Sequence, residues 1–145
     1  MRVKKYTDLY FLDLIRLVEK FHKEYLSDHS SACEPHVIIS TIKENAENTF
    51  LLISDDDKCV GVLAGIRLQS RLNHDILFQE IIWYVEKPFG RYAISLIKEV
   101  EKMLKSSGVS LIMMSVLERP KGEKIKRIYS RMGYKLEETH YMRKL

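Results

Sequence analysis

The sequence predicts a mixed α/β protein, with a central sheet of about six strands flanked by about four helices. The main observation is a change of pattern between Phe78 and Met103, where an apolar, β-branched run becomes a helical pattern after Pro88 and Gly90. Two further helical patterns come early in the chain, among apolar runs typical of strands. The resulting order, β-α-α-β-β-β-α-β-α-β, predicts a mixed sheet with helices on both faces.

Composition points to one globular domain over residues 1–145, because 46% of the residues are hydrophobic. The net charge of +4 is spread along the chain, and no basic face with interleaved aromatic residues predicts a nucleic-acid partner. No apolar run reaches the roughly 18 residues of a membrane helix. The first residues lack the apolar region of a signal peptide. We therefore expect a cytoplasmic protein in which Cys33 and Cys59 are reduced thiols, with a disulfide between them as the lesser alternative.

The first half of the chain predicts a short strand, two helices and a hairpin. The expected elements are a strand at 2–7, helices at 8–26 and 35–45, and paired strands at 49–54 and 59–68. Gly61 and Gly65 inside the second paired strand predict a bulge or a close approach of another backbone. The turn at 55–57 is Asp-Asp-Asp, but it lacks the alternating ligands, the glycine and the closing glutamate of an EF-hand loop. No metal site is therefore expected.

The second half predicts a buried strand, a loop and a long helix. The expected elements are strands at 76–85, 109–117 and 134–145, and helices at 91–106 and 124–131. The loop before the first of these helices leaves free backbone N–H groups at a helix start, which attract phosphate, and Lys87 and Arg91 add positive charge there. The alternative is an ordinary strand–loop–helix connection that binds nothing.

Two segments carry a resemblance to the GNAT family, the Gcn5-related N-acetyltransferases, of phage or bacterial type. The segment YVEKPFGRYAISLIKEVEKMLKSSGVSLIMMSV resembles the family's acyl-CoA segment, which is a strand, an Arg/Gln-x-x-Gly-x-Gly/Ala loop, a helix and a second strand. The segment GEKIKRIYSRMGYKLEET is similar to the family's closing segment, with Tyr129 on its tyrosine and Gly133 on its glycine. The run VGVLAG resembles an earlier strand, so the resemblance spans the chain.

The chain departs from the family pattern at the loop. Pro88 stands where the family has Arg or Gln, Arg91 stands on the first glycine, and only Ala93 matches directly. Gly122 replaces the asparagine that contacts pantetheine. These departures keep an alternative open, which is a catalytically silent GNAT-like binding module.

The resemblance implies an N-acetyltransferase that uses acetyl-CoA as co-substrate and acetylates an amine by direct attack. It implies a single GNAT-like acyltransferase domain in which the strand through the cofactor site parts from its neighbour. The implied cofactor-binding residues are Trp83, Tyr84 and Val85 on the strand, and Gly90, Arg91, Tyr92, Ala93 and Ile94 at the loop and helix start. The acceptor is an amine-bearing small molecule or a protein, and a homodimer is compatible with the family.

Two residues are candidates for catalysis. Tyr129 matches the family's tyrosine, so its phenol is expected to be the general acid for the leaving thiolate; the alternative is ring packing in a helix face. Glu80 lies in an apolar strand, where an ionisable group is costly unless it is used or paired, and it is the candidate base. A salt bridge or a solvated strand face is the alternative for Glu80, and Glu86 is a second choice of base.

Overall fold

The computed structural model describes residues 1–27, 34–70, 73–117, 121–141, 143 and 145. They form two compact units, Met1–Met113 and Met114–Leu145, which are described separately. Cys33 lies outside the described residues, and Cys59 is a buried free thiol whose pKa is raised to about 12 by burial. Among the described residues, no helix combines the length and apolar character needed to cross a membrane.

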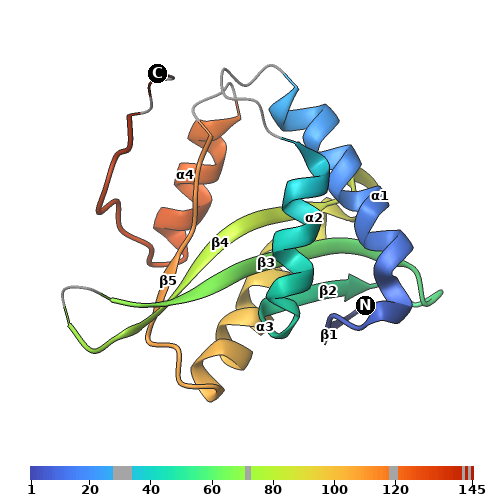
Figure 1. The fold of residues 1–145 in the computed structure, drawn as a ribbon, viewed down its shortest axis with the longest axis horizontal. Coiled ribbons are helices and arrows are strands. Elements are labelled where there is room, and N and C mark those ends of the chain that lie inside the picture. Colours follow the sequence, from blue (N-terminus) through green and yellow to red (C-terminus); the bar gives the residue numbers. More distant parts are fainter. Residues whose placement is uncertain (28–33, 71–72, 118–120, 142, 144) are drawn as a thin grey trace. The chain divides into compact units, whose positions relative to one another are not determined.

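The first unit holds a five-stranded sheet with the strand order β1-β2-β3-β4-β5 (Figure 1). Its strands are β1 (Arg2–Lys5), β2 (Thr49–Ile53), β3 (Cys59–Gln69), β4 (Ile76–Val85) and β5 (Leu111–Met113). The first four strands pair antiparallel in sequence order, whereas β5 pairs parallel to β4. The predicted mixed sheet is confirmed, with five strands in the described residues instead of about six.

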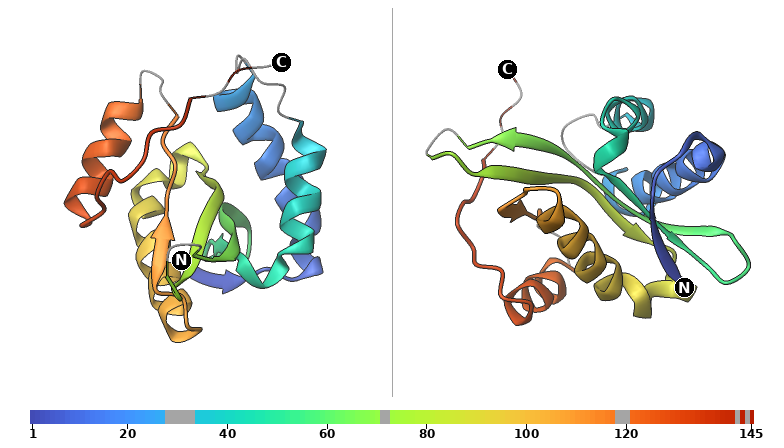
Figure 2. Two further views of the ribbon diagram at one scale, coloured as in Figure 1. Left: turned by 60° about the vertical axis from the view of Figure 1, so that its left-hand side comes forward. Right: turned by 90° about the horizontal axis from the view of Figure 1, so that it is seen from below.

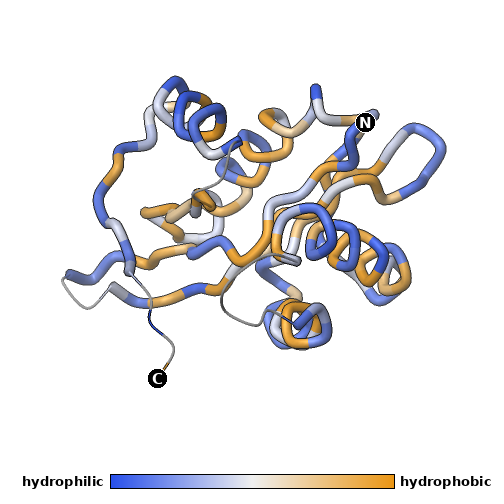
Figure 3. The backbone as a smooth tube through the Cα atoms, turned by 90° about the horizontal axis from the view of Figure 1, so that it is seen from above, coloured by the Kyte–Doolittle hydropathy of each residue, from blue (hydrophilic) through white to orange (hydrophobic). Residues whose placement is uncertain are grey.

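The helices of the first unit lie on both faces of this sheet, as the order of elements predicted (Figure 2). They are η1 (Asp8–Tyr10), α1 (Phe11–Phe21), η2 (His22–Leu26), α2 (Pro35–Glu44), η3 (Ala46–Asn48), η4 (Lys87–Tyr92) and α3 (Ala93–Ser106). Helices α1 and α2 cover one face and α3 covers the other. The residues buried along these elements are mostly apolar, while the 55–58 turn is hydrophilic (Figure 3).

The core on the α1 side packs this helix against the sheet. Leu14, Leu17 and Val18 of α1 are fully buried and belong to the same cluster as Ile82 and Tyr84 of β4. Burial of such side chains contributes about 1.5–3 kcal/mol each, so this face holds α1 firmly against the end of β4.

Gly65 is required by a close approach of β4. The register between β3 and β4 shifts between Ala64 and Gly65, which confirms the predicted bulge. A Cβ atom at Gly65 would lie 2.3 Å from the carbonyl oxygen of Gln79 and 2.5 Å from the Phe78 ring, so no larger residue fits without moving the strand. The bulge therefore depends on the absence of a side chain at this position.

The described residues of the second unit contain one helix, α4 (Gly122–Arg131), which starts slightly earlier than predicted. Gly133 ends it with a φ of +90°, a conformation that favours glycine. The strand predicted at 134–145 is wrong for the described residues of this segment, which adopt no regular structure. Leu136 and Tyr141 are strongly exposed, so these apolar residues lack the packing partner that a strand would need.

Candidate active site

Strand β4 extends beyond its pairing with β5. The parallel ladder consists of the pairs Leu77–Leu111, Phe78–Ile112 and Gln79–Met113, whereas β4 continues to Val85 against β3. In the described part of the chain, no ladder joins β4 to β5 beyond Gln79. The parallel pairing therefore stops several residues before the end of β4.

Successive residues of β4 turn their backbone N–H and C=O groups alternately toward β3 and toward the opposite side, on which β5 pairs with the first part of the strand. The N–H of Glu86 donates to the carbonyl of Val60 at 2.9 Å, so residues of this parity bond to β3. Tyr84 has the same parity and is paired with Val62, so its backbone is turned toward β3. Val85 has the opposite parity, and its N–H and C=O point toward the β5 side. Of the three strand residues expected to contact the cofactor, Trp83 and Val85 therefore turn their backbone N–H and C=O groups away from β3, whereas Tyr84 does not.

The loop after β4 is a turn of 3-10 helix, η4, which runs directly into α3. The helix expected to start at residue 91 therefore begins as an α-helix at Ala93, after a tighter turn. The N–H of Phe89 donates to Glu86 and that of Ala93 donates to Gly90, so the turn itself uses these two donors. Gly90 is exposed, and a Cβ atom there would meet nothing within 4 Å, so the turn does not require glycine.

Positive charge lies at the beginning of α3. Arg91 is exposed, and its guanidinium lies 4.9 Å from the centre of the Tyr92 ring. Ile94 in the first turn of α3 is also exposed. A helix start with an exposed arginine suits a phosphate group, because the first-turn N–H groups and the helix dipole favour an anion.

Glu80 lies at the β3–β4 bulge. It is paired with Gly65, and Ile81 is the extra residue before the register resumes at Ala64–Ile82. The residue is half-buried, neither fully solvated nor sealed in the core. Because side chains alternate along a strand, Glu80 lies on the same face of β4 as Phe78. The Phe78 ring packs against Phe50 and does not belong to the core cluster on the α1 side.

Glu86, the second choice of base, is instead an ion-pair centre. Its carboxylate is buried and accepts hydrogen bonds from Arg16 Nη1 at 2.6 Å and from Lys20 Nζ. Burial by itself would raise the pKa of this carboxyl group, but the hydrogen bonds and charges of Lys20 and Arg16 outweigh burial and lower it. A lowered pKa makes Glu86 a poor proton acceptor near neutral pH, so the carboxylate ties β4 to α1 instead.

A second carboxylate approaches β4 from α1, and sequence reasoning missed it. Glu24 Oε1 accepts a hydrogen bond from the Tyr84 phenol at 3.1 Å, and its Oε2 lies 3.9 Å from Lys87 Nζ. The rings of Phe21, Tyr25 and Tyr84 pack around this contact with centroid distances of 5.6–6.3 Å. The signal was present as a stripe on one helix face, because Arg16, Lys20 and Glu24 follow one another at a spacing of four residues.

Tyr129 lies in the second unit. It is 6% exposed, its phenol donates to the carbonyl of Ser115 at 3.3 Å, and its ring lies 5.4 Å from that of Tyr134. Both the expected ring packing and a hydrogen-bonding phenol are therefore observed in this residue. Gly122 begins α4 in close contact with the preceding segment, since a Cβ atom there would lie 2.7 Å from the Leu117 carbonyl oxygen.

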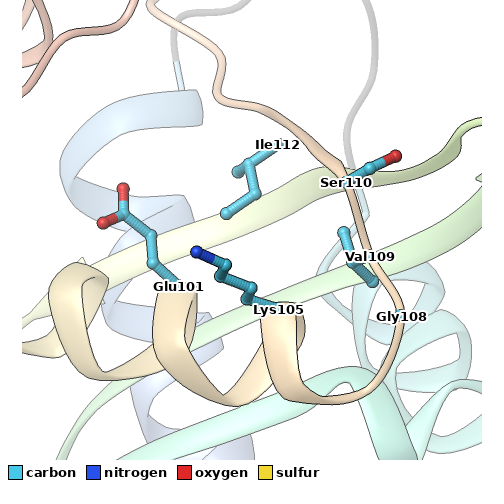
Figure 4. Close-up of a pocket in the computed structure, with 6 residues that line it drawn as sticks. All are labelled: Glu101, Lys105, Gly108, Val109, Ser110 and Ile112. Carbon is cyan, nitrogen blue, oxygen red and sulfur yellow. The ribbon is translucent and has the colours of Figure 1, made fainter.

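A surface depression in the first unit lies away from these residues (Figure 4). It has a volume of about 610 Å³ and lies between the last turns of α3 and the connection into β5, with Glu101, Lys105 and Ser110 on its rim. Lys105 is on the order of 18 Å from the start of α3 along the helix axis. The depression therefore belongs to neither the η4 turn nor the end of β4, and we assign it no part in the candidate site.

No family model and no curated protein matches the sequence. Solved structures match over nearly the whole chain. A probable acetyltransferase matches with a TM-score of 0.78 and 16% identity, covering 100% of this chain and 98% of its own. An aminoglycoside acetyltransferase from an uncultured soil metagenomic sample, in complex with sisomicin, matches with a TM-score of 0.73 and 15% identity, covering 99% and 95%. An acetyltransferase of the GNAT family from Staphylococcus aureus matches with a TM-score of 0.69 and 16% identity, covering 91% and 82%.

The chain has the GNAT fold. The full-length match confirms the fold predicted from the two sequence segments. At these identities the likeness concerns the fold alone, so the GNAT site residues must be argued from this chain's own side chains.

Proposed function

We propose that this protein is an N-acetyltransferase that transfers the acetyl group of acetyl-CoA to an amine. The observation that carries the proposal is the end of β4, which extends past its ladder with β5 and leads directly into a positively charged helix start. An extended edge can bond the amide groups of a pantetheine arm, and a helix start can bind a pyrophosphate. Both features lie in one continuous segment, in a chain with the GNAT fold.

The residues present suit this cofactor. Val85 offers its N–H and C=O on the β5 side, next to Trp83 of the same parity. Arg91 and the first turn of α3, including Ile94, face solvent with positive charge and helix-start donors. Gly90, Tyr92 and Ala93 shape the turn that presents them. Bound there, acetyl-CoA supplies the activated thioester carbonyl.

The reaction requires proton transfers at both the nitrogen and the sulfur. A base first takes one proton from the ammonium group of the acceptor, so that the free amine can attack the thioester carbonyl. A C–N bond forms, the C–S bond breaks, and the thiolate leaves with the electron pair. The nitrogen loses a second proton as the amide forms, and an acid protonates the thiolate. We assign the base to Glu80 and the acid to Tyr129, because a tyrosine phenol can donate a proton to a thiolate.

Cofactor binding is the first test. We expect acetyl-CoA to raise the melting temperature of the protein, since a ligand that binds only the folded state stabilises it. Arg91→Ala should weaken this shift, whereas Lys98→Ala, which removes another exposed cation of α3, should leave it unchanged. An absence of any acetyl-CoA binding would refute the proposal at its first step.

Catalysis is the second test. Thiol release from acetyl-CoA, measured with a panel of amines, should require Tyr129, and Tyr129→Phe should lower kcat by about 10²-fold or more. Tyr134→Phe is the matched control, because it removes the phenol of the neighbouring ring. An unchanged kcat in Tyr129→Phe would exclude the acid role. Tight CoA binding without turnover on any amine would favour the silent binding module.

A further inference from the structure

We propose that Glu24, together with the rings of Phe21, Tyr25 and Tyr84, forms a subsite that selects acceptors carrying an additional positive charge. The acceptor class is then a diamine, polyamine or amino sugar, in which one amine is acetylated and another ammonium group is held by Glu24. This inference rests on the proposed acetyltransferase function and specifies its substrate class.

Among the described residues, the Glu24 carboxylate is held in place by one hydrogen bond, and its second oxygen has only a distant cation as a partner. Tyr84 donates to Oε1 at 3.1 Å, which fixes the carboxylate plane, while Oε2 lies 3.9 Å from the ammonium of Lys87. The Glu24 side chain is 27% exposed, whereas that of Lys87 is 74% exposed. An exposed lysine at this distance forms a weak pair. Lys87 thus shows that an ammonium group fits beside Oε2, and a ligand cation can replace it at small cost.

Aromatic rings surround the same contact. Phe21 lies 5.6 Å from Tyr25 and 6.1 Å from Tyr84, and Tyr25 lies 6.3 Å from Tyr84, measured between ring centroids. Tyr84 is buried beneath the half-buried Phe21 and Tyr25. Rings at the surface next to a carboxylate suit an alkyl ammonium group, because the methylene carbons pack on the rings and the cation is attracted to their faces.

The backbone supplies an independent observation. Residues His22–Leu26 form a π-helical turn at the end of α1, and such turns are rare and often mark functional sites. This turn carries both Glu24 and Tyr25. As a whole residue Glu24 is exposed, and its side chain reaches the Tyr84 phenol.

The neighbouring groups leave the subsite with a negative charge. Burial, followed by the contact with Glu24, raises the pKa of both Tyr25 and Tyr84, so the two phenols remain neutral. Among the described residues near this contact, the carboxylate of Glu86 is already paired with Arg16 and Lys20. Glu24 therefore provides the negative charge available to a ligand here, and an acceptor with a carboxylate in place of the second ammonium would be repelled.

The subsite adjoins the proposed cofactor segment. Tyr84 precedes Val85, whose backbone faces the side that β5 has left, and Lys87 opens the η4 turn. An acceptor held by Glu24 on the α1 side would therefore lie beside the strand end to which we assign the thioester arm.

Three acceptors of matched length test the inference: 1,5-diaminopentane, pentylamine and 5-aminopentanoate. The wild-type protein should acetylate the diamine with a kcat/KM about 10-fold above that of pentylamine, since a hydrogen bond to a charged group contributes about 1.5–3 kcal/mol. The aminopentanoate should be the poorest acceptor. Glu24→Gln should raise KM for the diamine about 10-fold and abolish the preference, with KM for acetyl-CoA unchanged.

The controls separate this subsite from the proposed function. Glu19→Gln changes an exposed glutamate of the same helix and should leave the preference intact. Tyr84→Phe keeps the ring but releases the carboxylate, so it should weaken the preference by a smaller factor. A preference retained in a folded Glu24→Gln protein would overturn the inference and leave the acetyltransferase proposal standing.

A calorimetric titration decides the case in which no amine is acetylated. We expect 1,5-diaminopentane to bind the wild-type protein and to bind Glu24→Gln at least several-fold more weakly. Equal binding, or no binding to either protein, would overturn the subsite. Acetyl-CoA binding, measured separately, decides the proposed function.

Discussion

Two glutamates lie near the same end of β4, and the structure holds them differently: Glu86 directly follows the strand, and Glu24 reaches Tyr84 from η2. Glu86 is buried, bonded to both Arg16 and Lys20, and has a lowered pKa. Glu24 is bonded to one neutral phenol, with a cation only at 3.9 Å. A carboxylate whose charge is neutralised by the protein holds the fold together, whereas one whose charge is left over can bind a ligand. The comparison therefore separates a structural role, at Glu86, from a binding role, at Glu24, near one end of β4.

The largest expected effect is on stability. Glu86→Gln should lower the free energy of unfolding by about 2 kcal/mol, because it weakens two charge-assisted hydrogen bonds of a buried group. Glu24→Gln should change it by no more than about 0.5 kcal/mol, since an amide can still accept from Tyr84. Urea denaturation of both variants measures the difference. Equal losses would mean that the two glutamates do not differ as described.

The pH dependence of stability should follow the same division. The folded-state pKa of Glu86 is lowered, so its contribution is complete above the unfolded-state pKa of about 4.3 and is lost as the pH falls through the folded-state value. The stability gap between wild type and Glu86→Gln should thus be constant near neutral pH and shrink in acid. Thermal unfolding between pH 7 and pH 3 tests this, and a gap that grows in acid would contradict it.

A double-mutant cycle should localise the structural role. Arg16→Met and Glu86→Gln should couple by about 1 kcal/mol, because the two side chains meet at 2.6 Å with Glu86 buried. The pair Lys102–Glu99 meets at 2.7 Å but is exposed, so its cycle should give less than about 0.5 kcal/mol. Similar coupling in both cycles would show that burial makes no difference here.

The smallest expected effect concerns Lys87. If its ammonium competes with a ligand cation for Glu24, Lys87→Met should lower KM for 1,5-diaminopentane about two- to threefold. The KM for acetyl-CoA, measured in the same assay, shows whether the substitution also weakens cofactor binding at the η4 turn. The matched control is Lys98→Met on the exposed face of α3. An unchanged or higher KM for the diamine would show that Lys87 does not occupy the acceptor position.

Local pattern was sufficient for most elements of the first unit. The expected bounds of β4 are those observed, a bulge is present beside Gly65, and the carbonyl of Gln79 leaves no room for a side chain at that glycine. The strand expected at 134–145 failed, because alternation alone cannot supply a neighbouring strand. The η4 turn also differed from expectation, since local pattern could not show that its own hydrogen bonds would use the N–H groups of Phe89 and Ala93.

The candidate site, like the fold, could be predicted only in part from the sequence. By itself, the sequence determined the GNAT resemblance, the strand–turn–helix segment and the positions of Tyr129 and Glu80, because these follow from the order and spacing of residues along the chain. Only the tertiary structure decided that Glu86 is neutralised and that Glu24 meets Tyr84, since each contact joins residues at least 60 positions apart. The charge state and availability of a carboxylate depend on the groups that folding brings next to it, and local sequence does not record those neighbours.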